Sequence, residues 1–65
     1  MKSYSSREII KMLENDGWRL KACIGSHHQF EHQQKTGKVT IKHPQKDIPL
    51  PTLKSIEKQS GCKII

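Results

Sequence analysis

The residues of this chain best suited to chemistry near neutral pH are its four histidines: His27, His28, His32 and His43. Imidazole is the side chain whose unperturbed protonation changes between pH 5 and 8. His27 directly follows Gly25 and Ser26, residues typical of a tight turn, and it precedes an alternating, strand-like run. A ring at the exit of a turn could act as a general base or simply hold a phosphate. From composition and spacing alone, both uses stay open.

The sequence does not favour a metal site or a nucleophilic side chain. Strand parity puts His27 on the face opposite His28 and His32, and no acidic residue stands at a recognisable ligand spacing beside them. Neither Gly-x-Ser-x-Gly nor a Cys-His pair with an orienting carboxylate is present. Cys23 and Cys62 are far apart, without a Cys-x-x-Cys motif, which is typical of two free thiols. We therefore expect neither a metal nor another cofactor.

Cleavage of RNA needs less machinery, because RNA carries its own nucleophile in the 2′-hydroxyl. The protein must supply a base for that proton and positive charge at the phosphate. Twelve Lys and Arg residues against six Asp and Glu give a net charge of +6, which favours polyanionic partners over simple solubility. His27 is thus the candidate base, and the candidate RNA-binding residues are Arg19, Lys21, Gln29 and Lys42.

Two helices flank the central part of the chain. Ser5 and Glu8 have the spacing of a capping box, so a helix is expected to start there and to end at Gly17. Pro51 suits the first turn of a second helix, which Gly61 would end.

Three strands are expected between the helices. Residues 18–23 and 27–33 alternate with a period of two on either side of Gly25, which predicts a hairpin. In the predicted register Leu20 opposes Phe30 in the core, Arg19 opposes Glu31, Lys21 opposes Gln29, and Cys23 opposes His27. A third strand covers residues 39–42 and ends at His43-Pro44.

The resulting order, α-β-β-β-α, predicts an α+β fold with one three-stranded antiparallel sheet and both helices on one face. The other face would be open and would carry Arg19, Lys21, His27, Gln29, Thr40 and Lys42. His28 and His32 would lie on the core side. Residues 1–65 are long enough for one small domain, contain no run that could span a membrane, and point to a cytoplasmic protein.

Three ordered blocks of the chain resemble the HicA family of toxin mRNA interferases. They are Gly25-Ser26-His27-His28-Gln29-Phe30, then Val39-Thr40-Ile41-Lys42-His43-Pro44, then residues 51–61. The resemblance implies a double-stranded-RNA-binding-domain-like fold, endoribonuclease activity that arrests translation, and neutralisation by a HicB-like antitoxin. The family's catalytic histidine follows Gly-Ser, which matches His27.

Lys42 and Pro51 depart from the usual family residues, proline and glycine, but neither departure removes the histidine. The leading interpretation is therefore the toxin of a type II toxin-antitoxin system, a metal-independent endoribonuclease with His27 as general base. The alternative is a non-catalytic RNA-binding module using the same face, and a third possibility is a protein that acts chiefly through its partner.

Overall fold

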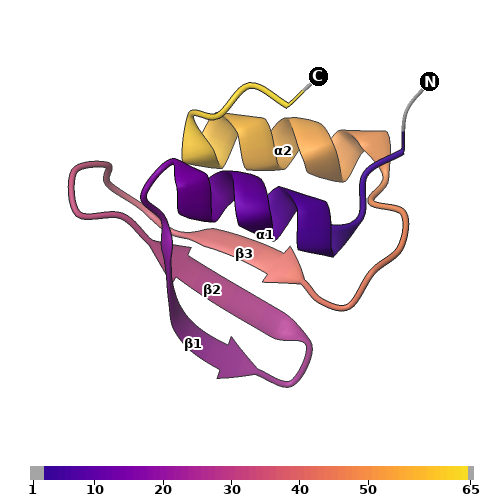
Figure 1. Cartoon of the computed structure of the whole chain (residues 1–65), viewed down its shortest axis with the longest axis horizontal. Helices are drawn as coiled ribbons and strands as arrows, with labels where there is room; N and C mark the ends of the chain where they lie inside the picture. Colours follow the sequence, from indigo (N-terminus) through magenta and orange to yellow (C-terminus); the bar gives the residue numbers. More distant parts are fainter. Residues whose placement is uncertain (1–2, 65) are drawn as a thin grey trace.

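The computed structural model describes residues 3–64 as two helices and one sheet (Figure 1). The elements are α1 (Ser6–Asn15), β1 (Arg19–Ile24), β2 (His27–Glu31), β3 (Val39–Lys42) and α2 (Leu50–Ser60). The strands pair antiparallel in the order β1-β2-β3. The predicted order and fold class are confirmed.

Local signals set the helix ends. The Ser5 side chain accepts a hydrogen bond from the Glu8 backbone N–H, and the Glu8 carboxylate accepts one from the Ser5 N–H, so the capping box is complete. Pro51 lies in the first turn of α2, and Gly61 caps its end. The capping box, and the Gly61 N–H that donates to the Glu57 carbonyl, satisfy backbone groups that a helix end leaves without partners. Proline suits the first turn because it has no N–H that would need a partner there.

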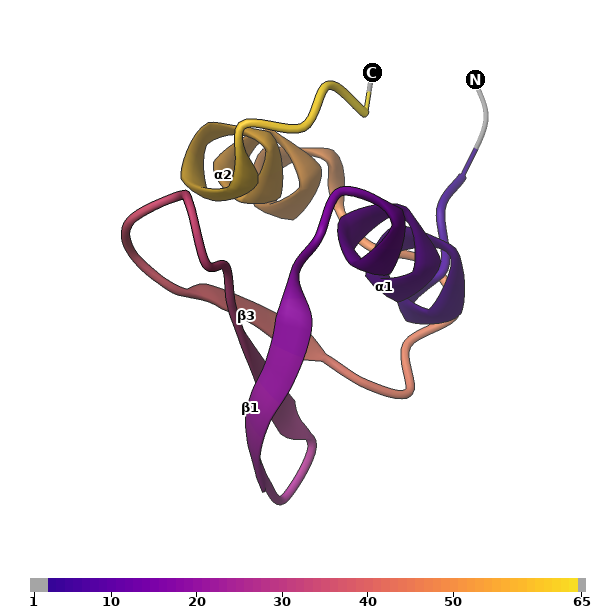
Figure 2. The same ribbon diagram turned by 60° about the vertical axis from the view of Figure 1, so that its left-hand side comes forward.

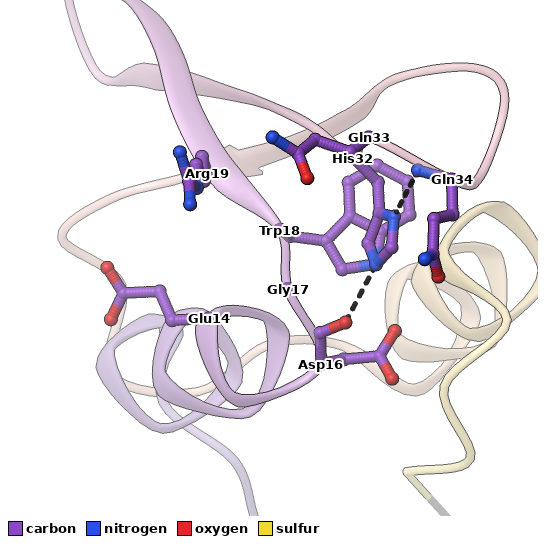
Figure 3. A pocket seen from close by; sticks show the side chains of 8 residues that line it. All are labelled: Glu14, Asp16, Gly17, Trp18, Arg19, His32, Gln33 and Gln34. Carbon is purple, nitrogen blue, oxygen red and sulfur yellow. Dashed lines mark hydrogen bonds between the residues drawn. The ribbon is translucent and has the colours of Figure 1, made fainter.

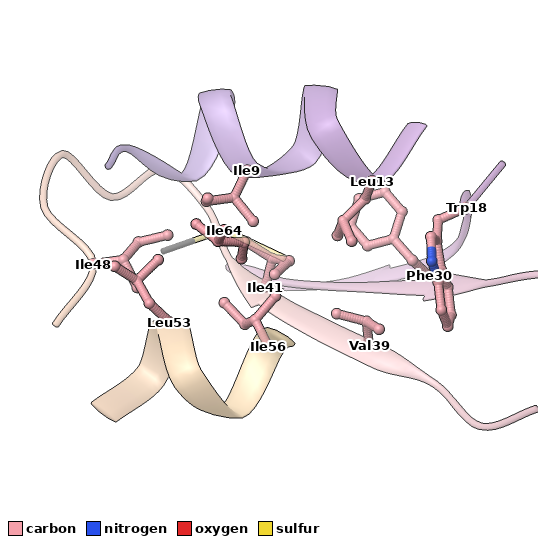
Figure 4. Packing of buried hydrophobic residues seen from close by; sticks show 10 residues of the cluster. All are labelled: Ile9, Leu13, Trp18, Phe30, Val39, Ile41, Ile48, Leu53, Ile56 and Ile64. Carbon is pink, nitrogen blue, oxygen red and sulfur yellow. The ribbon is translucent and has the colours of Figure 1, made fainter. Parts of the chain in front are cut away.

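Both helices lie on the same face of the sheet (Figure 2). Their apolar side chains meet those of β2 and β3 in one core, formed by Ile9, Leu13, Trp18, Phe30, Val39, Ile41, Ile48, Leu53, Ile56 and Ile64 (Figure 4). In β3 burial alternates, with Val39 and Ile41 buried and Thr40 and Lys42 exposed. One face of the sheet is therefore packed and the other is open, as expected for an antiparallel sheet with helices on one side.

The β1–β2 hairpin extends beyond the helices, away from the core (Figures 1 and 2). Leu20 pairs with Phe30 as predicted, but 52% of Leu20 is exposed while Phe30 is 1% exposed. The prediction that Leu20 lies in the core is wrong. Both helices contact β3, at the other side of the sheet, so the helix layer does not cover β1.

A β-bulge at Lys21 changes the register of the hairpin. Ala22 pairs with Gln29, Cys23 with His28, and Ile24 with His27. The predicted pairs of Lys21 with Gln29 and of Cys23 with His27 are therefore wrong. An alternating sequence does not reveal an inserted residue, and here the insertion leaves Lys21 unpaired instead of burying its charge.

The bulge also exchanges the faces of the residues that follow it. Opposed residues share a face of the sheet. Ala22 and Ile24 therefore lie on the open face with Gln29 and His27, whereas Cys23 lies on the helix side with His28.

Candidate nucleic-acid interface

His27 begins β2 and its side chain is exposed. Its Cα partners are Ile24 on β1 and Lys42 on β3, so all three side chains belong to the open face of the sheet. The two residues before His27 form the hairpin turn, with φ of 59° at Gly25. A glycine with positive φ at the first central position is what a two-residue type II′ turn requires. The turn thus presents the His27 imidazole to solvent.

The predicted cations do not form one cluster around His27. Lys42 is directly opposite it. Arg19 pairs with Glu31, and Lys21 Nζ lies 3.8 Å from Glu31 Oε1. Glu31 is four positions along the strand from His27, which is roughly 13 Å. Lys42 is therefore the cation placed to act beside His27, and Arg19 and Lys21 lie at the base of the hairpin.

Gln29 occupies the middle of the open face. It pairs with Thr40 on β3 and with Ala22 on β1, and its side chain is half-buried. The amide lies between the His27 end and the Arg19 end of the face, where it can offer a donor and an acceptor to a bound strand.

The turn is fixed from its inner side by two histidines. The Ser26 carbonyl accepts a hydrogen bond from the His43 backbone N–H at 2.8 Å and lies 3.3 Å from His28 Nδ1. This carbonyl belongs to the peptide bond that leads into His27. His28 and His43 consequently determine where the backbone of His27 lies.

A polar chain continues from these two rings on the helix side of the sheet. The rings of His28 and His43 meet edge to face at 5.1 Å, and His28 Nε2 lies 3.5 Å from Cys23 Sγ. Sequence reasoning missed this Cys-His contact because it assumed a hairpin without a bulge. His28 lies on the core side, as predicted.

Ser6 anchors His43 to α1. Its side chain is 1% exposed, and its Oγ accepts the Gln45 backbone N–H at 2.9 Å and lies 2.7 Å from His43 Nδ1. A buried hydroxyl that already accepts one bond needs an acceptor for its own hydrogen. The Ser6 O–H therefore donates to His43 Nδ1, which makes this ring a structural one.

His32 is also structural. Its Nδ1 accepts the backbone N–H groups of Gln34 and Lys35 at 3.0 and 3.1 Å, and its Nε2 lies 2.7 Å from the Asp16 carbonyl (Figure 3). An acceptor at Nδ1 requires the tautomer with hydrogen on Nε2, which donates to Asp16. Both ring nitrogens are thus occupied, at the end of the hairpin remote from His27.

A pocket lies beside His32, not beside His27 (Figure 3). Its lining residues are Glu14, Asp16, Gly17, Trp18, Arg19, His32, Gln33 and Gln34. The Trp18 ring is 1% exposed, and its Nε1 has no hydrogen-bond partner within the part of the chain that the structure describes. Of the candidate-site residues, only Arg19 lines this pocket.

Residues 3–64 contain no group of three His, Cys, Asp or Glu side chains arranged to hold a metal ion. Neither helix of this range is long and apolar enough to cross a membrane.

The fold and the open face define a small basic α+β domain with a histidine presented by a hairpin turn. A family model described as the HicA toxin of bacterial toxin-antitoxin matches residues 6–62, which include all five elements of the fold. The chain belongs to the HicA toxin family. Membership identifies a toxin of a toxin-antitoxin system and implies an antitoxin partner. A search of curated proteins finds no match.

Proposed function

We propose that this protein is a metal-independent endoribonuclease in which His27 acts as general base on a cytoplasmic mRNA, so that translation stops. The observation that carries the proposal is the position of the exposed His27 on the open face, with Lys42 as its cross-strand Cα partner on β3. The match to a family of toxins supports the biological role.

The proposed reaction uses the substrate's own nucleophile. His27 takes the proton of a 2′-hydroxyl, and that oxygen bonds to the adjacent phosphorus. The bond from phosphorus to the 5′-oxygen of the next nucleotide breaks, which leaves a 2′,3′-cyclic phosphate and a 5′-hydroxyl. Lys42 stabilises the charge on the phosphoryl oxygens. The departing oxygen takes its proton from Lys42 or from water, since both nitrogens of His32 are held by the backbone.

The other residues of the open face hold the flanking strand. Arg19 and Lys21 lie too far along the hairpin to reach the same phosphate as Lys42, so they contact a neighbouring one. Gln29 hydrogen-bonds between the two positions. A HicB-like antitoxin is expected to cover the same face with acidic or aromatic groups near His27.

Removal of the imidazole tests the mechanism. His27→Ala and His27→Gln are expected to lower the cleavage of RNA in excess chelator by 100-fold or more, the range that general bases contribute. Far-UV circular dichroism should stay unchanged, because the side chain is exposed. A folded His27→Ala protein that still cleaves RNA and stops growth would disprove the role of His27.

A matched pair of lysines tests the electrostatic part. Lys42→Ala is expected to reduce cleavage, whereas Lys54→Ala, which removes an exposed lysine from α2 on the other side of the domain, should leave it unchanged. Equal losses would show that net charge, not the position opposite His27, is what matters.

The alternative function is RNA binding without cleavage, which the separation of Arg19 and Lys21 from His27 favours, because these cations suit a binding face better than a compact active site. The same chelator experiment separates the two functions. Intact RNA together with a strongly salt-dependent mobility shift would favour binding alone.

A further inference from the structure

Three chemically different side chains form one row across the open face. Ile24, His27 and Lys42 are consecutive Cα partners on β1, β2 and β3. Neighbouring strands are about 4.8 Å apart, so Ile24 and Lys42 flank His27 on its two neighbouring strands at similar backbone distances. Without the bulge at Lys21, Cys23 would occupy the position of Ile24.

The position of Ile24 leaves much of its apolar surface in contact with water, which is energetically unfavourable. It is 65% exposed, more than Leu20 at 52% or Leu50 at 39%. Bulges often occur next to functional sites, where they redirect a side chain. Here the redirected side chain is an isoleucine beside the candidate general base.

We infer that Ile24 is a nucleobase-contact site for the nucleotide whose 2′-hydroxyl His27 deprotonates. The inference rests on the proposed function. In a ribonucleotide the carbon that bears the 2′-hydroxyl lies between the carbon that bears the base and the carbon that bears the 3′-phosphate. When the hydroxyl is at His27 and the phosphate is at Lys42, the base is directed to the opposite side, over Ile24.

The charges around the row favour a nucleic-acid strand as the occupant. The open face carries Lys42 at one end and Arg19 at the other, within a chain of net charge +6. Every base presents a flat face with little polarity, so contact with an aliphatic side chain adds affinity with little preference among bases. Ile24 therefore positions the cleaved nucleotide and does not select its base.

Leu20 offers a matched control on the same strand. It is also largely exposed, but it pairs with Phe30 and so belongs to the helix side of the sheet. If removing any exposed apolar side chain from β1 weakens RNA binding, Leu20→Ala and Ile24→Ala will both show a raised KM. If the effect is specific to the row, only Ile24→Ala will show it.

The experiment uses two RNA strands that carry 2′-O-methyl groups at every position but one, so that only one bond can be cleaved. The second strand lacks the base at that nucleotide. For the wild type and for Leu20→Ala, loss of the base is expected to raise KM roughly tenfold, the size expected when an isoleucine side chain loses the surface that buries it. For Ile24→Ala, KM on the complete strand should rise by a similar factor, and loss of the base should add little to it. Ile24→Phe, which keeps an apolar surface there, should restore a low KM.

If removal of the base raises KM by the same factor for the wild type and for Ile24→Ala, the inference is wrong, although the proposed nuclease activity stands. A weaker affinity of Ile24→Ala for the antitoxin with unchanged KM for RNA would also overturn it, because Ile24 would then belong to a protein interface. Failure of the wild type to cleave any RNA would instead refute the proposed function. In that case the fully 2′-O-methylated strands, with and without the base, still test the contact by their binding affinities.

Discussion

The helix-covered body and the projecting hairpin differ in how much of their apolar surface is buried. In the body, Phe30, Val39 and Ile41 are at most 1% exposed and face the apolar sides of both helices. In β1, no residue is fully buried, although its strand pairing with β2 is extensive. The body is stabilised by burial of apolar surface, and β1 mainly by its backbone hydrogen bonds to β2. Side chains on the hairpin are therefore free to serve contacts with other molecules.

The histidines show the same contrast. His32, at the base of the hairpin, has both ring nitrogens bound to backbone groups and contacts Trp18 at a ring distance of 5.2 Å. His27, the first residue of β2, is exposed on the open face. The position of a histidine relative to the core thus decides whether its ring is held by the backbone or exposed to solvent.

The largest expected effect compares two cross-strand partners, Phe30 and Leu20. Phe30→Ala should destabilise the protein by roughly 3–5 kcal/mol, because it removes a ring from the packed core. Leu20→Ala should cost about 1 kcal/mol, since about half of the side chain is already in water. Urea denaturation followed by circular dichroism measures both.

If Phe30→Ala does not fold, Phe30→Leu gives the comparison in milder form, and it should still cost more than Leu20→Ala. Similar losses for the two partners would mean that the hairpin is packed in solution as tightly as the body.

The next comparison is between the glycines at the two ends of β1. A Cβ on Gly17 would lie 2.8 Å from His32 Nε2, at a φ of 102°, whereas a Cβ on Gly25 would meet nothing within 4 Å, at a φ of 59°. Gly25→Ala should cost roughly 1 kcal/mol of backbone strain. Gly17→Ala should cost roughly 3 kcal/mol, because a comparable strain is joined by displacement of the His32 ring.

Urea denaturation measures the free energies of unfolding of both variants, and cleavage assays on the same proteins measure their activity on RNA. Gly25→Ala should impair cleavage more than stability, because Gly25 belongs to the turn before His27. Equal destabilisation by the two alanines would show that the contact with His32 is not a constraint.

The smallest effect concerns an ion pair of the body. Lys35 Nζ donates to Asp16 Oδ2 and to the Ser60 carbonyl, which joins the ends of α1 and α2. The hydrogen bond from Lys35 lowers the pKa of Asp16, and the same bond raises the pKa of Lys35. The pair therefore stabilises the fold above about pH 4. The contribution disappears as the pH falls through the lowered pKa of Asp16 or rises through the raised pKa of Lys35.

Unfolding midpoints of wild type and Lys35→Met should thus differ slightly at pH 7, and the difference should shrink as the pH falls through the lowered pKa of Asp16. High salt should reduce the difference, because the pair is exposed. Lys54→Met, which removes an exposed lysine from α2, is the control. Cleavage of RNA at pH 7 should be unaffected in both variants, and a difference in midpoint that grows toward low pH would contradict the assignment.

Local signals made much of this structure predictable. The capping box of Ser5 and Glu8, the proline in the first turn of α2 and the glycine after it act within a few residues of each helix end. The alternation of β3 was equally direct, because both of its inward residues, Val39 and Ile41, are buried in the core. The Gly-Ser-His order located the hairpin turn and its exposed ring for the same reason.

The features that the sequence left undetermined depend on distant residues. Alternation places Leu20 on the helix side of β1, but only the position of the helices over β2 and β3 decides that its surroundings are water. The bulge at Lys21 depends on pairing across two strands, and it determines that Ile24, not Cys23, shares a row with His27.

The sequence by itself determined the order of the elements, the helix ends and the turn that presents His27, since each follows from preferences of neighbouring residues. The tertiary structure decided that the rings of His32 and His43 are held by hydrogen bonds while His27 is exposed, and that Lys42 is the cross-strand partner of His27. Those outcomes depend on strand register and on the extent of the helix layer, and both arise from packing between segments far apart in the chain.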